Sequence, residues 1–437
     1  MKLPSHIRYC IDALEQAGFA AYAVGGCVRD SLLGLEPHDY DLCTAATPEQ
    51  IKQVFSNHRL VLSGEKHGTV SVILEQPVEI TTFRTEGSYT DSRHPDWVRF
   101  VTHIDADLSR RDFTVNAMAY SPTWGFADPF GGREDLQSKT LRSVGDPNLR
   151  FTEDALRILR GVRFAVRYGL AVEAETKTAM LALADRIDSL ARERVFDELC
   201  KLLPLVSAND LITFAPILVQ TIPELQACLG FDQHSPHHAY DVFTHTAHVV
   251  EATPPELGLR WAALLHDVGK PVVFYQDESG RGHFPDHASV GAEMADNLLR
   301  RLRAPNALRE RVVMLIRHHM TPFPPERAIL RRRLSKFGED VWALLALQKA
   351  DFHAKGVAGE YDFLPTQNLL QTLLQEQGCL SLKDLAVDGR DLIALGFTGK
   401  AVGNCLNHLL AQVLEETLPN EKSALLAEAE HYREEQL

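Results

Sequence analysis

The chain has 437 residues and a formal net charge of −14, and 45% of its residues are hydrophobic. This length exceeds what one compact core holds, so we expect about two to four domains. No segment approaches the roughly 18 consecutive apolar residues of a membrane-spanning helix, so we expect no membrane partner. Seven cysteines are scattered without a Cys-x-x-Cys spacing. That usage indicates a reducing compartment, here the cytoplasm, and argues against disulfides or structural zinc.

The first third of the chain alternates helical and strand patterns, and the rest is almost entirely helical. The strands are expected at 22–24, 40–43, 69–74, 78–83 and 98–101. From residue 146 onward the apolar spacing is helical. We therefore predict an α+β multidomain protein, with a small mixed-sheet head followed by all-α regions. Clusters of Pro and Gly near 204, 235–236 and 322–325 mark the joints between them.

The segment 24–43, VGGCVRDSLLGLEPHDYDLC, is the first that carries chemistry. Gly25 and Gly26 precede a short helical pattern, where a glycine turn and helical amides suit phosphate. Asp39 and Asp41 are two residues apart in a strand pattern, so both carboxylates project from one face. Such a pair suits two Mg²⁺ ions and a triphosphate, and hence in-line phosphoryl or nucleotidyl transfer. A lone Asp-x-Asp is more often a solvated turn.

The whole string GGCVRDSLLGLEPHDYDL resembles the active-site motif of class II tRNA nucleotidyltransferases and bacterial poly(A) polymerases. These enzymes belong to the DNA polymerase β-like nucleotidyltransferase superfamily. The resemblance implies a nucleotidyltransferase head in which Gly25, Gly26 and Arg29 bind the nucleotide. It also implies a third catalytic carboxylate on a neighbouring strand, and Glu79 is the matching position. The alternative for Glu79 is an exposed strand residue without a role.

Two further segments of the head resemble motifs of the same family. YTDSRHPDWVRFV (89–101) is a loop by composition. It resembles the flexible loop that helps switch the pocket from CTP to ATP. SRRDFTVNAMAY (109–120) resembles the ribose-recognition motif. This likeness implies that Arg111, Asp112 and Asn116 bind the nucleotide through its 2′-hydroxyl, a group that deoxynucleotides lack.

FTEDALRILRGVRF (151–164) places Asp154 and Arg157 three residues apart, on one face of an expected helix. An ordinary ion pair is the common alternative. In the family these positions read the incoming base. Cytosine and adenine both present an amino donor beside a ring nitrogen acceptor. A carboxylate and a guanidinium can therefore select C and A without a template, while Arg160 and Arg163 continue a basic face suited to phosphates or the RNA end.

Charge is distributed unevenly despite the acidic total. Ten Arg and one Lys stand against two Glu between 300 and 336, and six Arg against three acids between 142 and 167. Such stretches suit RNA phosphates, and solvated helix faces are the alternative. ARERVFDELCKLL (191–203) resembles the family's neck helix, in which Arg194 and Glu198 are expected to form an i,i+4 pair with a structural role.

The second half contains His and Asp residues at spacings typical of a metal centre. His266-Asp267 follows His245 by 21 residues, and His287 follows by another 21. Imidazoles and carboxylates from successive helices suit Mn²⁺, Fe²⁺, Ni²⁺ or Mg²⁺, with open positions for water. The alternative is unrelated core or surface histidines. The order resembles the HD phosphohydrolase superfamily, which implies core ligands and additional second-metal ligands. The core ligands are His245, His266, Asp267 and Asp351, and the additions are His287 and His318.

Residues 388–422 resemble the tail of bacterial tRNA nucleotidyltransferases, so the resemblance spans nearly the whole chain. It implies a head (1–145), a helical neck and RNA-binding region (146–230), an HD domain (231–355) and a tRNA-binding tail (356–437). The implied enzyme adds C, C and A to the tRNA 3′ end from CTP and ATP with Mg²⁺, with an HD-domain phosphohydrolase activity in addition.

Three alternatives stay open from the sequence. The first is a poly(A) polymerase or an enzyme that adds only the terminal A. The second is an HD phosphohydrolase or 2′,3′-cyclic phosphodiesterase as the main activity. The third is an RNA-binding protein with a vestigial active site, which the complete set of head motifs disfavours.

Overall fold

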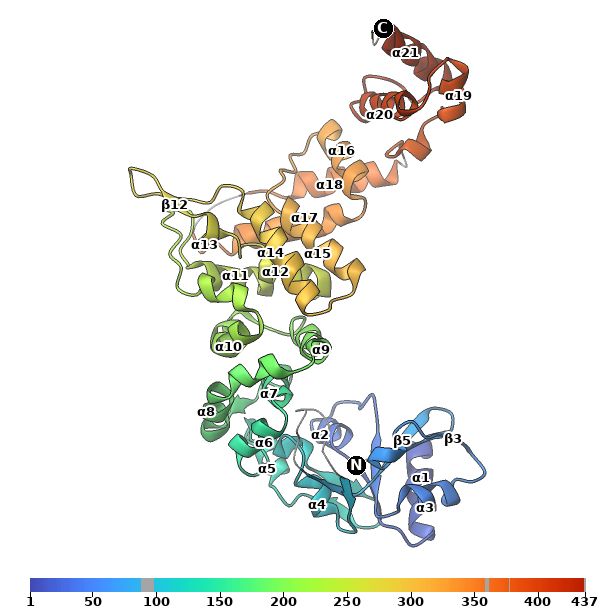
Figure 1. Cartoon of the computed structure of the whole chain (residues 1–437), viewed down its shortest axis with the longest axis vertical. Coiled ribbons are helices and arrows are strands. Elements are labelled where there is room, and N and C mark those ends of the chain that lie inside the picture. The colour runs from blue at the N-terminus through green and yellow to red at the C-terminus, as the bar shows by residue number, and fades with distance from the viewer. Residues whose placement is uncertain (88–97, 358–360, 377, 436–437) are drawn as a thin grey trace. The chain divides into compact units, whose positions relative to one another are not determined.

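The computed structural model describes residues 1–87, 98–357, 361–376 and 378–435 (Figure 1). They form two compact units, one of residues 1–223 with 301–304 and one of 224–300 with 305–437. The expected nucleotide-switching loop, 89–101, lies outside the described residues except for its last four. Among the helices of the described ranges, none is long and apolar enough to cross a membrane.

The first unit contains a mixed seven-stranded sheet in the order β3-β4-β5-β2-β1-β8-β9. Only β2 and β5 run parallel, and the other neighbouring pairs are antiparallel. The strands are β1 (Ala21–Val24), β2 (Asp41–Thr44), β3 (Arg59–Val61), β4 (Thr69–Ile73), β5 (Pro77–Thr82), β8 (Ala119–Ser121) and β9 (Gly125–Ala127). A separate pair joins β6 (Arg84–Glu86) to β7 (Val98–Phe100). The predicted mixed-sheet head and its five expected strands are confirmed.

The two faces of this sheet have different coverings. Helices α1 (Ser5–Gln16) and α3 (Pro48–Val54) pack against one face and against each other (Figure 1). Helix α1 buries apolar residues at one-turn spacing, namely Ile7, Cys10, Ile11 and Leu14. The other face buries Tyr22, Val24 and Cys43 together with Leu108 of α4 (Ile104–Leu108). At one end of that face the strands present polar side chains.

Helices complete the first unit. They are α2 (Gly26–Leu32), α5 (Gly132–Gln137), α6 (Pro147–Glu153), α7 (Leu156–Tyr168), α8 (Ala174–Ala182), α9 (Arg192–Leu202) and α10 (Ala208–Thr221). The expected single helix across 151–164 is wrong. Asp154 lies between α6 and α7 in an extended conformation, with φ −145° and ψ 101°. Its side chain accepts a hydrogen bond from the Leu156 amide and so starts the second helix.

The second unit is helical apart from one short hairpin, β12 (Tyr275–Gln276) with β13 (Gly282–His283). Helix α12 is buried along its length and packs against α11, α15 and α17. The bounds are α11 (Val242–Ala252), α12 (Leu257–Leu265), α13 (Lys270–Val273), α14 (His287–Arg301), α15 (Asn306–His318), α16 (Arg327–Phe337), α17 (Asp340–His353) and α18 (Leu364–Gln375).

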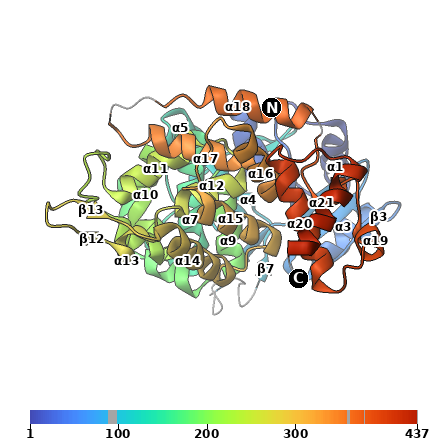
Figure 2. The ribbon, with the colours of Figure 1, turned by 90° about the horizontal axis from the view of Figure 1, so that it is seen from above.

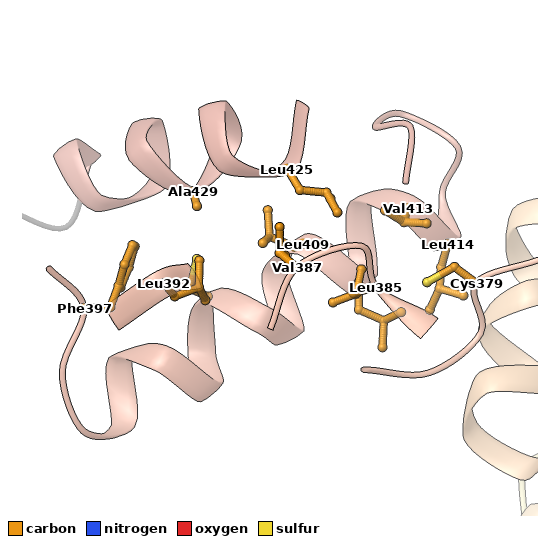
Figure 3. Packing of buried hydrophobic residues seen from close by; sticks show 12 residues of the cluster. Cys379, Leu385, Val387, Leu392, Phe397, Leu409, Val413, Leu414, Leu425 and Ala429 are labelled. Carbon is orange, nitrogen blue, oxygen red and sulfur yellow. The ribbon is translucent and has the colours of Figure 1, made fainter. Parts of the chain in front are cut away.

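The chain ends in three helices with a core of their own. Figures 1 and 2 show α19 (Gly389–Ala394), α20 (Lys400–Leu414) and α21 (Lys422–Glu435) side by side. Their shared core is drawn in Figure 3, where Leu392, Leu409 and Leu425 come from the three helices in turn. The four domain ranges expected from the sequence stay predictions.

Many arginines of the basic stretch at 300–336 form ion pairs with acidic residues of other elements. Arg327 of α16 bonds Glu376 and Glu416, and Arg332 bonds Glu415. Arg331 is buried and donates to the carbonyls of Cys379 and Val413. These arginines therefore hold α16 against the C-terminal helices, and RNA binding by this stretch stays a prediction.

Candidate active site

A glycine turn brings the start of α2 close to an arginine. Gly25 has φ +76°, and its amide donates to the Met118 carbonyl at 3.0 Å. A Cβ at this position would lie 2.7 Å from Nη1 of Arg111. Both the backbone conformation and the close approach therefore require glycine here.

The carboxylates of the head meet through strand register. Leu42 of β2 pairs with Ile80 of β5, and both are buried. Asp41 and Glu79 stand one position earlier on the same two strands, so both project from the opposite face, where they are exposed. Asp39 lies just before β2 rather than within it, and it is also exposed. Loss of solvation raises the pKa of Asp41, with Arg111 opposing the rise and Asp39 adding to it.

A pocket of about 470 Å³ lies beside these carboxylates. All ten predicted nucleotide-binding residues line it, together with Asp41. The ten are Gly25, Gly26, Arg29, Arg111, Asp112, Asn116, Asp154, Arg157, Arg160 and Arg163. Asp39 and Glu79 are not among its lining residues. The lining also includes Arg110, Leu156, Phe164 and Arg194, which were not predicted as binding residues. The pocket is therefore strongly cationic and suited to a triphosphate.

The ribose-motif residues form one buried network. Asp112 accepts from the Asn116 side-chain amide at 3.0 Å and from Nε of Arg160 at 2.8 Å. Burial alone would raise the pKa of the Asp112 carboxyl. The charge of Arg160 and the hydrogen bonds outweigh burial and lower that pKa to about 2. Asp112 is thus a fixed anion that orients an amide and a guanidinium at the pocket wall.

An Asp154–Arg157 ion pair, the alternative to base recognition, does not form, and the expected Arg194–Glu198 pair is wrong. Arg157 donates to Glu153 at 2.8 Å, while Asp154 accepts from Arg194 at 2.9 Å. Glu198 instead accepts from Nε of Arg163 at 2.6 Å. The break between α6 and α7 explains the first exchange, because it turns Asp154 away from the face that Arg157 occupies. Arg157–Glu153 has the ordinary i,i+4 spacing, but periodicity within a single helix could not reveal the Asp154–Arg194 and Arg163–Glu198 pairs.

A second cluster lies in the second unit. One ligand atom each from His245, His266 and Asp267 lie within 4.8 Å of one another, and so do those of Asp267, His287 and His319. Asp351 adds a carboxylate oxygen 2.9 Å from Nε2 of His245. Asp267 belongs to both groups, so one carboxylate sits between two sets of imidazoles.

The imidazoles of this cluster are all oriented in the same way. The Nδ1 atoms face backbone carbonyls at distances from 2.7 to 3.2 Å. Nδ1 is then the donor, and each Nε2 lone pair is directed into the cluster. Nε2 of His245 and Nε2 of His266 are buried without a hydrogen bond of acceptable geometry. Such orphaned acceptors fit a divalent cation.

His319, not His318, belongs to this cluster. The His318 ring packs against Phe337 with centroids 4.9 Å apart, and its Nδ1 lies 3.4 Å from the Thr321 hydroxyl. His319 is buried, which lowers its pKa to about 4. The sequence held a signal for this choice. The apolar face of α15 carries Val312, Leu315 and Ile316, and residue 319 continues that spacing.

Cations border the second cluster. Nζ of Lys270 lies 2.7 Å from Oδ2 of Asp267 and donates to Gln233 at 2.8 Å. A cavity of about 260 Å³ next to the ligands is lined by Lys270, Arg281 and Lys355 as well as His238. Positive side chains beside a candidate metal centre favour an anionic substrate such as a phosphate ester.

Matches to family models agree with these two centres. Residues 21–142 match the poly(A) polymerase head domain, and residues 237–348 match the HD domain. Residues 169–207 match a probable RNA- and SrmB-binding site of polymerase A. The protein is thus a nucleotidyltransferase that combines a poly(A) polymerase head with an HD domain.

Relatives along the full length narrow this class. The CCA-adding enzyme of Levilactobacillus brevis is 34% identical over 436 residues, 96% of each chain. That of Bacillus velezensis is 32% identical over 416 residues, 94% of this chain and 93% of the relative. The crystal structure of the Bacillus stearothermophilus CCA-adding enzyme in complex with CTP superposes with a TM-score of 0.73 at 27% identity, covering 100% and 99% of the two chains. The chain belongs to the CCA-adding enzymes, which are tRNA nucleotidyltransferases, and the main functional prediction is confirmed.

Proposed function

We propose that the pocket of the first unit binds CTP and ATP in turn and transfers their nucleotidyl groups to the 3′-hydroxyl of tRNA. The observation that carries this proposal is the register of β2 and β5, which sets Asp41 beside Glu79 on an open face of the sheet. The CTP complex of the Bacillus stearothermophilus enzyme supports the nucleotide assignment.

The family and the HD domain are metal-dependent classes, and we assign Mg²⁺ to Asp39, Asp41 and Glu79. Within the residues that the structure describes, no side chain forms a hydrogen bond or ion pair with these three carboxylates. Free carboxylate oxygens on neighbouring strands are suitable donors for this hard cation. Bound Mg²⁺ supplies charge neutralisation for the triphosphate and the leaving pyrophosphate.

The arginines of the pocket bind and orient the nucleotide. Gly25 and Gly26 line the pocket at the start of α2, where backbone amides can donate to a phosphate. Arg111 reaches this turn from the other side, and Arg160 and Arg163 continue the positive wall. Positioning and charge stabilisation of this kind carry most of a nucleotidyl transfer.

Base selection falls to Asp154 and Arg157 even though they bond other partners. Each Asp154 oxygen accepts one hydrogen bond from the protein, so each keeps a free lone pair. Arg157 uses Nη1 for Glu153 and Arg150 and one Nη2 proton for Arg110, which leaves Nε–H and one Nη2 proton. The amino group of cytosine or adenine can donate to Asp154 while Arg157 donates to the ring nitrogen. The carbonyls of uracil and guanine would face Asp154 and be rejected.

Nucleotide addition to tRNA lacking CCA tests the proposal. Asp41→Asn removes a charge at the metal position, and we expect incorporation to fall roughly 100-fold or more while tRNA binding persists. Asp188→Asn is the matched control, because the Asp188 side chain is 63% exposed. Product length decides between three additions and a long A tail. Appreciable turnover by Asp41→Asn contradicts the metal assignment, and an A tail contradicts CCA addition.

A second activity is supported by the orphaned ligand atoms of the second unit. We propose that His245, His266, Asp267 and Asp351, with His287 and His319 in place of His318, hold Mn²⁺, Fe²⁺ or Ni²⁺. The bound cation supplies an activated water for phosphoester hydrolysis. Lys270, Arg281 and Lys355 would bind the substrate's phosphate from the cavity wall. All seven cysteines are free, and we propose a cytoplasmic location on that basis.

Measuring bound metal in two variants tests which of the adjacent residues His318 and His319 is a metal ligand. We expect His319→Ala to lose bound divalent metal, measured by elemental analysis of the purified protein, and to lose hydrolysis of a generic phosphodiester. His318→Ala is the neighbouring control and should keep both. The reverse pattern would reinstate His318 as the ligand, and equal metal content in both variants would exclude α15 from the metal site.

A further inference from the structure

Five side chains in the first unit form a chain of hydrogen bonds whose two ends, Arg160 and Tyr168, both lie on α7. Arg160 donates to Asp112, which also accepts from Asn116. The Asn116 carbonyl oxygen accepts from Nη1 of Arg29 on α2. Nη2 of the same guanidinium donates to the hydroxyl of Tyr168, at the other end of α7. This chain of hydrogen bonds therefore fastens the α2 turn and the ribose motif to one helix.

Tyr168 is the only one of these five residues that does not line the nucleotide pocket. Its ring lies under Arg29, with the guanidinium carbon 4.3 Å from the ring centroid. Its hydroxyl accepts from Arg29 and donates to Asp30 at 3.0 Å. Burial raises the pKa of the Tyr168 hydroxyl, so this proton remains available to Asp30 at neutral pH. The Tyr168 hydroxyl thus orients the Arg29 guanidinium through a hydrogen bond, and the Tyr168 ring supports it by stacking.

The position of Arg29 determines which way the Asn116 amide faces. A guanidinium can only donate, so it selects the carbonyl end of the amide. The amino end is then left to donate to Asp112. In a flipped amide, the Asn116 NH2 group would face the Arg29 donors, and the Asp112 carboxylate would lose the hydrogen bond that it accepts from Asn116. Without the Tyr168 hydroxyl, Arg29 keeps its bonds to Asp30 and its stacking on the Tyr168 and Phe164 rings. It loses one of the hydrogen bonds that fix the guanidinium facing the Asn116 amide.

We propose that Tyr168 is a positioning residue for ribose recognition, acting through Arg29 to hold Asn116 and Asp112 in the arrangement that accepts a 2′-hydroxyl. This inference rests on the proposed function, because it takes Asp112 and Asn116 as the ribose-binding groups. It adds to that site a residue which does not touch the nucleotide. Discrimination between ribonucleotides and deoxyribonucleotides is then controlled in part from outside the pocket.

The test compares CTP with dCTP. Tyr168→Phe keeps the ring under Arg29 and removes only the hydroxyl. We expect kcat/KM for CTP to fall about tenfold, mainly through KM, while kcat/KM for dCTP changes less than about twofold. Tyr9→Phe is the matched control, since Tyr9 is exposed and its hydroxyl lies near His58 alone, at 3.5 Å. An equal fall for both nucleotides, or an unchanged ratio, overturns the proposal.

Two further variants keep the outcomes distinct. Asp30→Asn weakens the same clamp from outside the pocket lining, and it should shift the CTP to dCTP ratio in the same direction if Tyr168→Phe proves unstable. An unchanged ratio in a folded Asp30→Asn protein would then overturn the proposal. Asn116→Ala tests the ribose site itself. If Asn116→Ala leaves discrimination intact, the ribose assignment fails. If Asn116→Ala abolishes discrimination while Tyr168→Phe leaves the CTP to dCTP ratio unchanged, only the role of Tyr168 fails.

Discussion

Asp112 is a buried carboxylate that stays ionised because Arg160 and Asn116 stabilise its negative charge. Its pKa of about 2 lies below the value of roughly 3.9 for an unfolded Asp. A carboxyl with a lowered folded-state pKa stabilises the fold above the unfolded value, and this contribution is lost as the pH falls through about 2. The contribution at neutral pH is on the order of 2 kcal/mol, and about half remains at pH 3.

Asp112→Asn should therefore lower the free energy of unfolding by about 2 kcal/mol at pH 7. The difference from the wild-type protein should shrink by about half at pH 3. Urea unfolding at the two pH values measures both quantities, with Asp188→Asn as the exposed control. A difference independent of pH would mean that lost hydrogen bonds, rather than the lowered pKa, account for the loss.

For individual residues, some positions in the site could be predicted from the sequence and others could not. The motifs of the head were sufficient to predict that Asp41 and the ribose-motif residues share one pocket, whereas Asp39 and Glu79 do not line it. The partner of Asp154 was not predictable, because Arg194 reaches it from another helix. Only the buried face of α15 distinguishes His319 from His318, and that spacing required the helix to be known first.

At the scale of elements, α7 is shaped by a glycine in its middle. A Cβ at Gly161 would lie 2.9 Å from Cζ of Phe113 and 3.1 Å from Cε of Met180. Phe113 is fully buried and cannot move aside freely. The glycine therefore allows α7, which carries Arg157, Arg160 and Arg163, to pack directly on the ribose motif.

Gly161→Ala should destabilise the first unit by about 1–2 kcal/mol, because overpacking exceeds the gain in helix propensity. Gly403 of α20 has nothing within 4 Å of an added Cβ. Gly403→Ala should therefore stabilise its helix by about 0.5–1 kcal/mol. Hydrogen exchange of peptides from α7 and α20 reports each effect locally. Stabilisation by both substitutions would show that Phe113 and Met180 relax without cost.

Element types were predicted better than element contacts. Strands β4 and β5 bury every second residue, whereas β1 and β2 are short apolar runs buried along most of their length. The short β8 and β9 were not predicted. The sequence order of the strands also conceals that β2 pairs with β5 in parallel.

At the scale of the whole molecule, two chemical centres lie in separate compact units. Every residue assigned to nucleotide addition belongs to the first unit, and every residue of the histidine cluster belongs to the second. The substitutions that disable one centre touch no residue of the other.

His266→Ala should abolish metal binding by the second unit and leave CCA addition within about twofold of the wild-type rate. Asp41→Asn should do the opposite, losing addition and keeping phosphodiester hydrolysis. Both rates are measured on the full chain with a single preparation of each variant. Loss of CCA addition in a folded His266→Ala protein would show that the centres depend on one another.

The pairing of β2 with β5 determines both the packing of the core and the arrangement of the catalytic carboxylates. The register that buries Leu42 against Ile80 is the one that exposes Asp41 beside Glu79. A slip of one residue in either strand would bury a carboxylate and expose an aliphatic side chain. A chain that has lost the catalytic arrangement in this way has also lost its core, so it would be removed as unfolded before it could compete for tRNA.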